Sequence, residues 1–368
     1  LVIAGSVSNG GAAVLQAAEQ DSGGLIDGVV AAEPSAQPRT TAGYGVQQGG
    51  VAVPIYGMSL IDYITFANIY QPCAALAPAV VMSETSYFNF MTLTGMNARA
   101  GNRCAALAAR GLVAGADTAT QATDALAKLK AYGWLPENDT MHNAHYGLGN
   151  APIVAMMYTN AYGRFSVTDK VCGMNAAAVA AGAPAAIAAT VKAASYATGN
   201  GTVNGTPATV IYNDSVGGAK GWNLGVSPST GVADFSLDAA LCQRALYTGV
   251  DSVSGAALAA NSTPTKAQSD AVRAGVNEVL LNGNLRGKPT LMLAGRSDAL
   301  LPINNSERAY AAYNRSVEGS GSKLRYIEVT NAQHFDTFNA FSGFDTRFVP
   351  LHSYFVQAMN AMYANLKS

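Results

Sequence analysis

The first eleven residues, LVIAGSVSNGG, constrain the fold of this chain more than any other segment does. The apolar residues 1–4 predict a buried parallel strand, and residues 12–20 predict a helix after a tight turn that contains serine and glycine. A serine at the apex of such a strand–turn–helix needs small residues two positions before and two positions after it, because larger side chains would collide across the turn. Ser6 and Gly10 stand at these positions around Ser8. Ser8 is therefore our candidate nucleophile.

Two other interpretations of this turn stay open. Ser6 at the apex, between Ala4 and Ser8, would lack the trailing glycine. A turn rich in serine and glycine also occurs in α/β proteins without a catalytic role. Later segments of the sequence distinguish among these three interpretations of the turn.

Two later loops supply a carboxylate and an imidazole, each directly after an apolar strand. Residues 290–294 predict a strand before a loop with Asp298, and residues 324–329 predict a strand before a loop with His334. Helices are expected at 304–313 and 350–366. A serine becomes a good nucleophile when an imidazole takes its proton and a carboxylate holds that imidazole in one tautomer. The order Ser, Asp, His, with strand ends meeting at one sheet edge, predicts an α/β-hydrolase fold.

The base has few competitors, because the chain contains only 4 histidines. His142 and His145 lie in a polar region that we expect to form a loop, and His352 lies early in the last expected helix, where packing explains it better. His334 is the one that follows a strand at the right place.

The acid has one serious competitor. Glu33 lies at the end of an expected strand, residues 28–32, and an acid at that position would also reach the sheet edge. Asp336 follows His334 too closely in sequence to orient its ring from behind. Asp298 is preferred, although an aspartate before a helix can also act as a cap.

Composition narrows the classes of partner. Charged residues make up 12% of the chain, about half of the usual share of roughly 25%, and the net charge is −1. We find no basic stripe that would indicate nucleic acid or an anionic membrane as a partner. The most apolar long stretch, residues 176–190, contains Gly182 and Pro184 and is shorter than the roughly 20 residues that a membrane span needs.

Four cysteines occur, none in a C-x-x-C pair or at zinc-ligand spacing: Cys73, Cys104, Cys172 and Cys242. An even number in a chain of low charge favours two disulfides and a secreted or periplasmic location over free thiols in the cytoplasm. Three pairings are possible; sequential pairing, 73 with 104 and 172 with 242, is our expectation.

A long insertion separates the expected core segments. About 250 residues lie between Glu33 and the strand at 290, whereas such connections normally have only a few residues. We therefore expect core segments at 1–34 and 287–368 and a mainly helical lid at 35–286. Helices are expected at 59–77, 102–111, 117–132 and, around Pro184, 176–198, and a loop with one strand (208–212) at 199–218. Tyrosines 158, 162 and 212 of this region are candidates to line an ester-binding cleft, although core packing is the simpler use for each.

The elbow strand at residues 1–4 raises a structural problem. In α/β-hydrolases an elbow normally follows the fifth strand of eight, so a sheet built only from later strands would leave this apolar strand at an edge. We expect the chain to carry the C-terminal part of the sheet, and an N-terminal segment of the same protein to supply the earlier strands. That segment would also give one oxyanion-hole donor, and the backbone N–H of Asn9 the other.

The chain resembles a known family, the D-(−)-3-hydroxybutyrate oligomer hydrolases, which are esterases of poly(3-hydroxybutyrate) breakdown. The elbow segment VIAGSVSNGG carries the first match, and the lid stretches QPCAAL, NAYGRFSV and NDSVGG have no generic reason to recur in other hydrolases. The matching stretches run along the whole chain, at residues 2–11, 18–21, 24–28, 71–76, 160–167, 213–218, 285–289, 295–300, 334–336 and 345–352.

The resemblance implies hydrolysis of the ester bonds of short 3-hydroxybutyrate oligomers, with Ser8 as nucleophile and with no metal or cofactor. Because such oligomers end in a carboxylate, Arg296 and Arg164 are candidate anchors, although an ion pair within the protein is the safer interpretation of each. Two alternatives stay open. One is another lidded carboxylesterase, similar to feruloyl esterases or tannases, and the other is a non-catalytic binding protein on a hydrolase scaffold.

Overall fold

The computed structural model describes residues 1–39, 43, 45–48, 51–53, 57–83, 90–93, 95–166, 169–180, 183–186, 188, 190, 211–213, 225–234 and 236–368. The strands are β1 (Ile3–Val7), β2 (Gly28–Ala32), β3 (Val46–Gln48), β4 (Val51–Val53), β5 (Met174–Ala180), β6 (Ala183–Ala186), β7 (Ile211–Asn213), β8 (Thr290–Gly295) and β9 (Leu324–Val329). Among these residues no helix is long and apolar enough to cross a membrane.

The helices fall into two groups along the chain. Those next to the main sheet are α1 (Ser8–Gln20), α12 (Glu307–Glu318) and α13 (Leu351–Lys367). Those between β2 and β8 are α2 (Leu60–Ala74), α3 (Pro78–Ser83), α4 (Phe90–Leu93), α5 (Asn97–Ala109), α6 (Thr118–Ala131), α7 (His142–Gly147), α8 (Asn150–Gly163), α10 (Leu237–Thr248) and α11 (Lys266–Glu278). Short 3₁₀ turns are η1 (Pro136–Thr140), η2 (Val171–Gly173), η3 (Gly319–Gly321) and η4 (Asp336–Ala340).

The main sheet has four strands in the order β1-β2-β8-β9, and every neighbouring pair is parallel. The strands predicted at 28–32 and 324–329 are confirmed, and the strand predicted at 290–294 is one residue longer. The first strand starts at Ile3 and continues to Val7, so α1 begins directly at Ser8 and not at residue 12. Because all four strands are parallel, their carboxyl ends meet at one edge, and the loops that leave this edge carry the candidate site residues.

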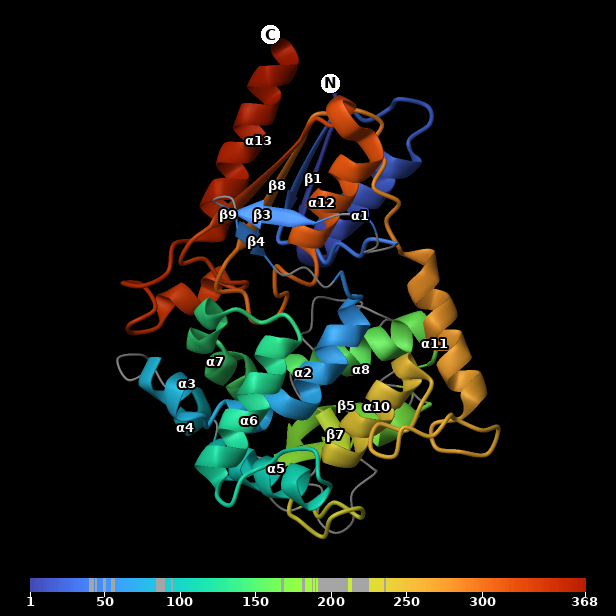
Figure 1. Ribbon diagram of the computed structural model, residues 1–368, viewed down its shortest axis with the longest axis vertical. Helices are drawn as coiled ribbons and strands as arrows, with labels where there is room; N and C mark the ends of the chain where they lie inside the picture. The colour runs from blue at the N-terminus through green and yellow to red at the C-terminus, as the bar shows by residue number, and fades with distance from the viewer. Residues whose placement is uncertain are drawn as a thin grey trace.

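Helices cover both faces of this sheet, with α13 on one side and α1 and α12 on the other (Figure 1). Strand β2 shows how the sequence allows this. Val29 and Ala31 pack towards α1 and α12, whereas Val30 and Ala32 pack towards α13. A strand that is buried on both faces has to be apolar at every position, which explains the uninterrupted run GVVAA.

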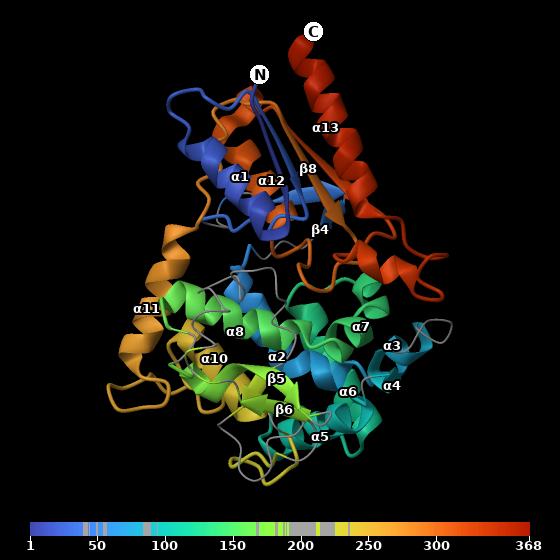
Figure 2. The same cartoon turned by 180° about the vertical axis from the view of Figure 1, so that it is seen from behind.

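The segment between β2 and β8 leaves the sheet and forms a separate helical layer next to its carboxyl edge (Figures 1 and 2). Its central helix, α2, is buried around almost its whole circumference, as expected for a helix without a polar face. Ser59 caps α2 by accepting a hydrogen bond from the backbone N–H of Asp62 at 3.3 Å, and Asp117 and Thr120 form a capping box at α6. The helices predicted at 59–77, 102–111 and 117–132 correspond to α2, α5 and α6.

The helix predicted at 176–198 is wrong over its first half. Residues 174–180 and 183–186 form the antiparallel strands β5 and β6, and β5 also pairs with β7. Alanine favours helices, but Pro184 lacks the N–H that an α-helix requires, and it lies in the second strand opposite Val179. Strand β7 overlaps the end of the strand predicted at 208–212, whereas residues 191–210 and 214–224 lie outside the described part of the chain.

Two disulfides tie the helical layer together, in the pairing expected from sequential order. Cys73 of α2 is bonded to Cys104 of α5, and Cys172 of η2 is bonded to Cys242 of α10. The bridges close loops with sequence separations of 31 and 70 residues. Such cross-links stabilise mainly by restricting the unfolded chain.

A buried ion pair joins three segments of the same layer. Arg103 of α5 is 2% exposed, contacts the carboxylate of Asp234 through Nε, and donates from Nη1 to the carbonyl oxygens of Asn68 and Ile69 at 2.6 and 3.0 Å. Asp234 in turn accepts from the backbone N–H of Ser236 at 3.0 Å. Burial opposes both charges, but their mutual attraction raises the pKa of Arg103 and lowers the pKa of Asp234.

We expect Arg103→Gln to lower the free energy of unfolding by about 3–5 kcal/mol, because it leaves a buried carboxylate without its cation. The exposed pair of Arg164 with Glu278 is the matched control, and Arg164→Gln should change stability by about 0–1 kcal/mol. Urea denaturation of both variants measures the difference. Equal effects of the two substitutions would contradict this role for the buried pair.

Candidate active site

Ser8 lies at the apex of a sharp turn between β1 and α1. Its φ of 55° is in the left-handed region, which costs energy for a residue with a side chain and is typical of strained functional turns. The structure places Ser8 at this apex, and not Ser6. A Cβ atom at Gly10 would lie 2.2 Å from Ser6 Oγ, so the two small residues predicted around the serine are packed against each other.

Three side chains from three loops form one hydrogen-bonded chain at the carboxyl edge of the sheet. Ser8 Oγ lies 3.0 Å from His334 Nε2, and His334 Nδ1 lies 2.7 Å from Asp298 Oδ2. Ser8 is half-buried, whereas His334 and Asp298 are buried. The structure therefore brings together the nucleophile, base and acid that the sequence predicts, although they lie up to 326 residues apart.

Asp298 is fixed from behind by the backbone. Its second oxygen, Oδ1, accepts hydrogen bonds from the N–H groups of Leu300 and Leu301 at 2.8 and 2.7 Å. The carbonyl oxygen of Asp298 accepts from Asn138 Nδ2 at 2.9 Å, which connects the acid loop to η1 of the helical layer. Both carboxylate oxygens are thus engaged, and Oδ2 is held towards the imidazole.

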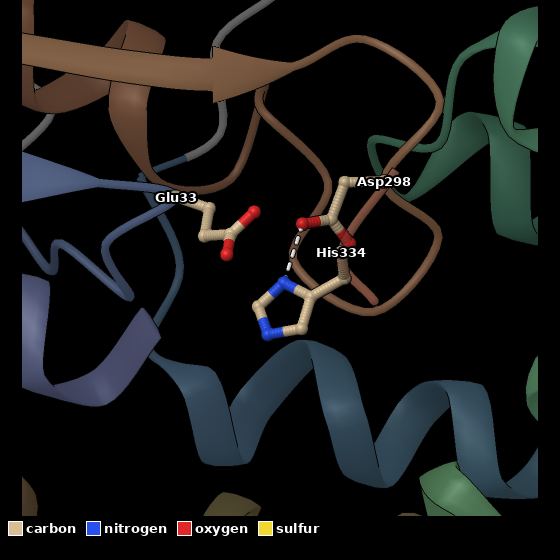
Figure 3. Close-up of side chains that lie close together, drawn as sticks. All are labelled: Glu33, Asp298 and His334. Atoms are coloured by element: carbon tan, nitrogen blue, oxygen red, sulfur yellow. Dashed lines mark hydrogen bonds and ion pairs between the residues drawn. The ribbon is translucent and has the colours of Figure 1, made fainter. Parts of the chain in front are cut away.

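A second carboxyl group, that of Glu33, points towards the same imidazole from the end of β2 (Figure 3). Glu33, Asp298 and His334 each offer an atom within 4.8 Å of the others. Burial raises the pKa of Glu33 to about 8. Burial alone would lower the pKa of His334, but the carboxylates of Asp298 and Glu33 outweigh it and raise the pKa to about 9. Within this group, His334 Nδ1 and Asp298 Oδ2 are hydrogen-bonded to each other at 2.7 Å.

A pocket of about 350 Å³ opens beside the serine and the imidazole. Most of its lining is apolar. The lining residues are Ser8, Asn9, Ser35, Leu60, Val154, Met157, Tyr158, Leu300, Leu301, His334 and Phe335. Four of them (60, 154, 157 and 158) come from α2 and α8, so the helical layer forms one wall.

The three tyrosines predicted to line a cleft have different positions. Tyr158 lines the pocket and is hydrogen-bonded to the side chain of Asn9, the residue after the serine. Tyr162 accepts a hydrogen bond from Gln37 Nε2 at 3.2 Å and does not belong to the lining. The side chain of Tyr212 lies outside the described part of the structure.

Neither predicted anchor lines this pocket. Arg296 is paired with Glu137 and Glu328, its Nε lying 3.1 Å from Glu137 Oε1. Arg164 is exposed and forms its ion pair with Glu278 at 2.7 Å. Both arginines therefore form ion pairs within the protein, and the position of neither supports a contact with substrate near Ser8.

The expected loop around the other histidines is wrong. His142 and His145 lie in α7, both fully buried, and burial lowers their pKa values to about 3 and about 4. Their helix packs under the site, with the ring of His145 5.6 Å from that of Phe335. His352 is exposed on the first turn of α13, so the packing role expected for it is also wrong.

Sequence reasoning missed most of the pocket wall. Leu300 and Leu301 lie two and three residues after Asp298, and Phe335 directly follows His334, so their proximity to the site was available as a signal. Val154 and Met157 lie on a mainly apolar helix without a clear polar face, so the sequence does not indicate which of its residues face the serine.

The geometry defines a candidate nucleophilic site of the hydroxyl–imidazole–carboxylate class. The family model for the 3HB-oligomer hydrolases matches residues 1–368, and the chain belongs to this family.

Several relatives support the assignment, all of them named D-(-)-3-hydroxybutyrate oligomer hydrolase. The chain is 46% identical to the protein of Albidiferax ferrireducens over 100% of this chain and 50% of that protein. The protein of Paracidovorax citrulli is 44% identical over 99% of this chain and 50% of that protein. The protein of Ralstonia pickettii is also 44% identical, over 100% of this chain and 48% of that protein. The chain thus spans about half the length of the curated relatives it matches. No solved structure matches it.

The two buried histidines of α7 predict acid sensitivity. A histidine with a lowered folded-state pKa stays neutral in the fold but binds a proton when the chain unfolds, at an ordinary pKa of about 6.5. Their contribution to the free energy of unfolding is therefore complete above about pH 6.5 and is lost as pH falls towards about 4. At about pH 5 the loss is about 2 kcal/mol for each histidine.

Removing one of these titrating groups isolates the effect. The pH dependence of unfolding free energy between about 6.5 and 4.5 should be flatter in His142→Gln than in the unsubstituted protein, whatever the offset at higher pH. Equal slopes in the two proteins would show that His142 does not titrate in this way.

Proposed function

We propose that this protein is a serine esterase that hydrolyses the ester bonds of short 3-hydroxybutyrate oligomers to monomers. The observation that carries the proposal is the hydrogen-bonded chain from Ser8 through His334 to Asp298 beside an apolar pocket. The names of the relatives point to the substrate class. A hydroxyl is a weak nucleophile alone, so the 3.0 Å contact with Nε2 is what makes attack on an ester possible.

In the first half of the reaction Ser8 Oγ forms a bond to the ester carbonyl carbon while its proton moves to His334 Nε2. Asp298 holds Nδ1–H and stabilises the imidazolium. The proton then passes from Nε2 to the leaving alkoxide as the old C–O bond breaks. Water repeats the sequence on the acyl-enzyme and releases the second product.

The oxyanion needs donors that are already in place. Asn9 is the second residue of α1, where backbone N–H groups have no partner within the helix and the helix dipole favours negative charge. We assign its N–H to the oxyanion hole. Its side chain contacts Tyr158, which connects the helical layer to this turn.

The pocket suits a neutral, branched acyl unit. Leucine, valine, methionine and phenylalanine side chains form most of its wall, and its described lining residues include no lysine or arginine. A 3-hydroxybutyryl unit is small and uncharged apart from the terminal carboxylate of the oligomer, so this end would lie away from the pocket.

We further propose an α/β-hydrolase core at residues 1–34 and 287–368, with residues 35–286 as a lid. The helical layer lies next to the carboxyl edge and contributes one wall of the pocket, which supports this division (Figures 1 and 2). The chain leaves and returns at neighbouring points, where Pro38 forms a bridge with Leu281.

We also propose that a further segment of the protein extends the sheet beyond β1. Within the described residues β1 is hydrogen-bonded only to β2, and Leu1, Val2 and Val7 are 65%, 53% and 38% exposed. An apolar strand with an open edge is a pairing site. The two disulfides support a secreted or periplasmic location.

Substitution of the nucleophile tests the proposal. In the intact protein Ser8→Ala should lower kcat/KM for 3-hydroxybutyrate trimer by at least about 1,000-fold and abolish labelling by a fluorophosphonate, whereas Ser6→Ala should keep both. A feruloyl ester cleaved faster than the trimer would instead indicate an esterase for aromatic esters. An unlabelled, inactive protein would indicate a binding function.

The raised pKa of His334 predicts an alkaline enzyme. His334 has to be neutral to accept the serine proton, and the carboxylates around it hold it protonated up to about pH 9. We therefore expect kcat/KM to rise with pH, with a midpoint well above the ordinary histidine value of about 6.5. A midpoint at or below that value would contradict the charge arrangement described here.

A further inference from the structure

Glu33 has a position that the hydrogen-bonded chain of Ser8, His334 and Asp298 does not explain. It follows β2 directly, and its backbone N–H donates to the carbonyl oxygen of Leu293 at 2.7 Å, which fixes it to the neighbouring strand. Its φ of 40° is in the left-handed region, which is unfavourable for a glutamate. Strain of this kind persists where the surrounding structure enforces it.

The side chain of Glu33 is buried and aimed at the site. The residue is 8% exposed, and within the described part of the chain its Oε2 has no hydrogen-bond partner. Figure 3 shows the carboxyl directed towards the imidazole of His334 from the side of β2, whereas Asp298 approaches from the loop after β8. A buried carboxyl oxygen without a partner is costly, so its location beside a group that becomes positive requires an explanation.

Several charged groups surround this carboxyl. Among the described residues, His334 is the cation-forming group that acts on it, and the negative groups are Asp298, Asp336 and the fully buried Glu307. Asp336 is already engaged by the N–H groups at the start of α13, and Ser306 Oγ donates to Glu307 at 2.6 Å. Glu307 Oε1 also lacks a partner among the described residues, but Glu33 and Asp298 are the two of these carboxyl groups that lie within 4.8 Å of a His334 ring nitrogen.

We propose that Glu33 is a second carboxyl group serving His334, a positioning residue that lies beside the imidazole together with Asp298 and stabilises the imidazolium formed when Ser8 gives up its proton. This inference rests on the proposed esterase function. Glu33 exchanges no proton in the step; the proton moves from Ser8 Oγ to His334 Nε2, and Nδ1–H stays on the ring. Glu33 acts through its charge, which is present above its pKa of about 8 and which the positive imidazolium favours.

The consequence is a base that depends on two acids. The single variant Asp298→Asn should lose less activity relative to the unsubstituted protein than the double variant loses relative to Glu33→Gln. In the single variant one carboxyl, that of Glu33, still faces the ring. The losses of the two substitutions should therefore not be additive, which a double-mutant cycle on kcat measures.

The test uses Glu33→Gln in the intact protein, because glutamine keeps the size and removes the charge. We expect kcat for the trimer to fall by about 10-fold with KM little changed, since the imidazolium exists only along the reaction path. The acid-limb midpoint of kcat/KM should move down by about 0.5 pH unit or more, because a negative neighbour of His334 is lost. Glu19→Gln, a buried carboxyl of α1 that does not act on His334, should lower stability and leave the midpoint unchanged.

Glu33→Asn provides a second variant, since asparagine tolerates the left-handed backbone and also lacks the charge. The same downward shift in both variants supports the proposal. An unchanged midpoint and unchanged kcat in the variant that folds would overturn it while leaving the esterase function intact. A wild-type protein that neither cleaves trimer nor reacts with a fluorophosphonate would overturn both.

Discussion

The hydrogen bond between His334 Nδ1 and Asp298 Oδ2 is the interaction on which the rest of the site depends. At 2.7 Å it fixes the ring so that Nε2 faces Ser8, and it does so because Asp298 is itself held by two backbone N–H groups. The parallel sheet makes this possible by bringing the ends of β1, β8 and β9 to one edge. Strain at Ser8, burial of the imidazole and the surrounding negative charge all follow from placing three polar groups in this space.

The helical layer is cross-linked internally and also contacts the site at the edge of the sheet. Two disulfides and the buried pair of Arg103 with Asp234 hold α2, α5 and α10 together. The same layer turns an apolar wall towards the serine and, through Asn138, braces the loop of Asp298. The pocket is thus shaped in part by α2 and α8 residues that are distant in sequence from the reacting atoms.

The sequence predicted the parts of the structure in which local pattern and fold agree. Apolar runs located the strands of the sheet, and the small residues around Ser8 located the turn, because both signals are steric and short in range. The prediction of a helix in the alanine-rich segment at 174–186 was wrong. Alanine favours a helix, but Pro184 cannot continue one, and the segment forms two strands. The buried histidines of α7 and most of the pocket wall were not predictable, because burial there depends on packing between elements far apart along the chain. The α/β-hydrolase fold, the division into core and lid, and the roles of the site residues stay predictions.

Direct capture of the acyl-enzyme tests the central claim most closely. The intact protein, mixed with 3-hydroxybutyrate trimer and quenched in acid within one turnover, should carry a hydroxybutyryl ester on the peptide that contains Ser8, identified by mass. In Asp298→Asn this species should form more slowly, because the ring is no longer held with Nε2 towards the serine. An acyl group on any other residue, or product release with no acyl group on the protein, would contradict the account.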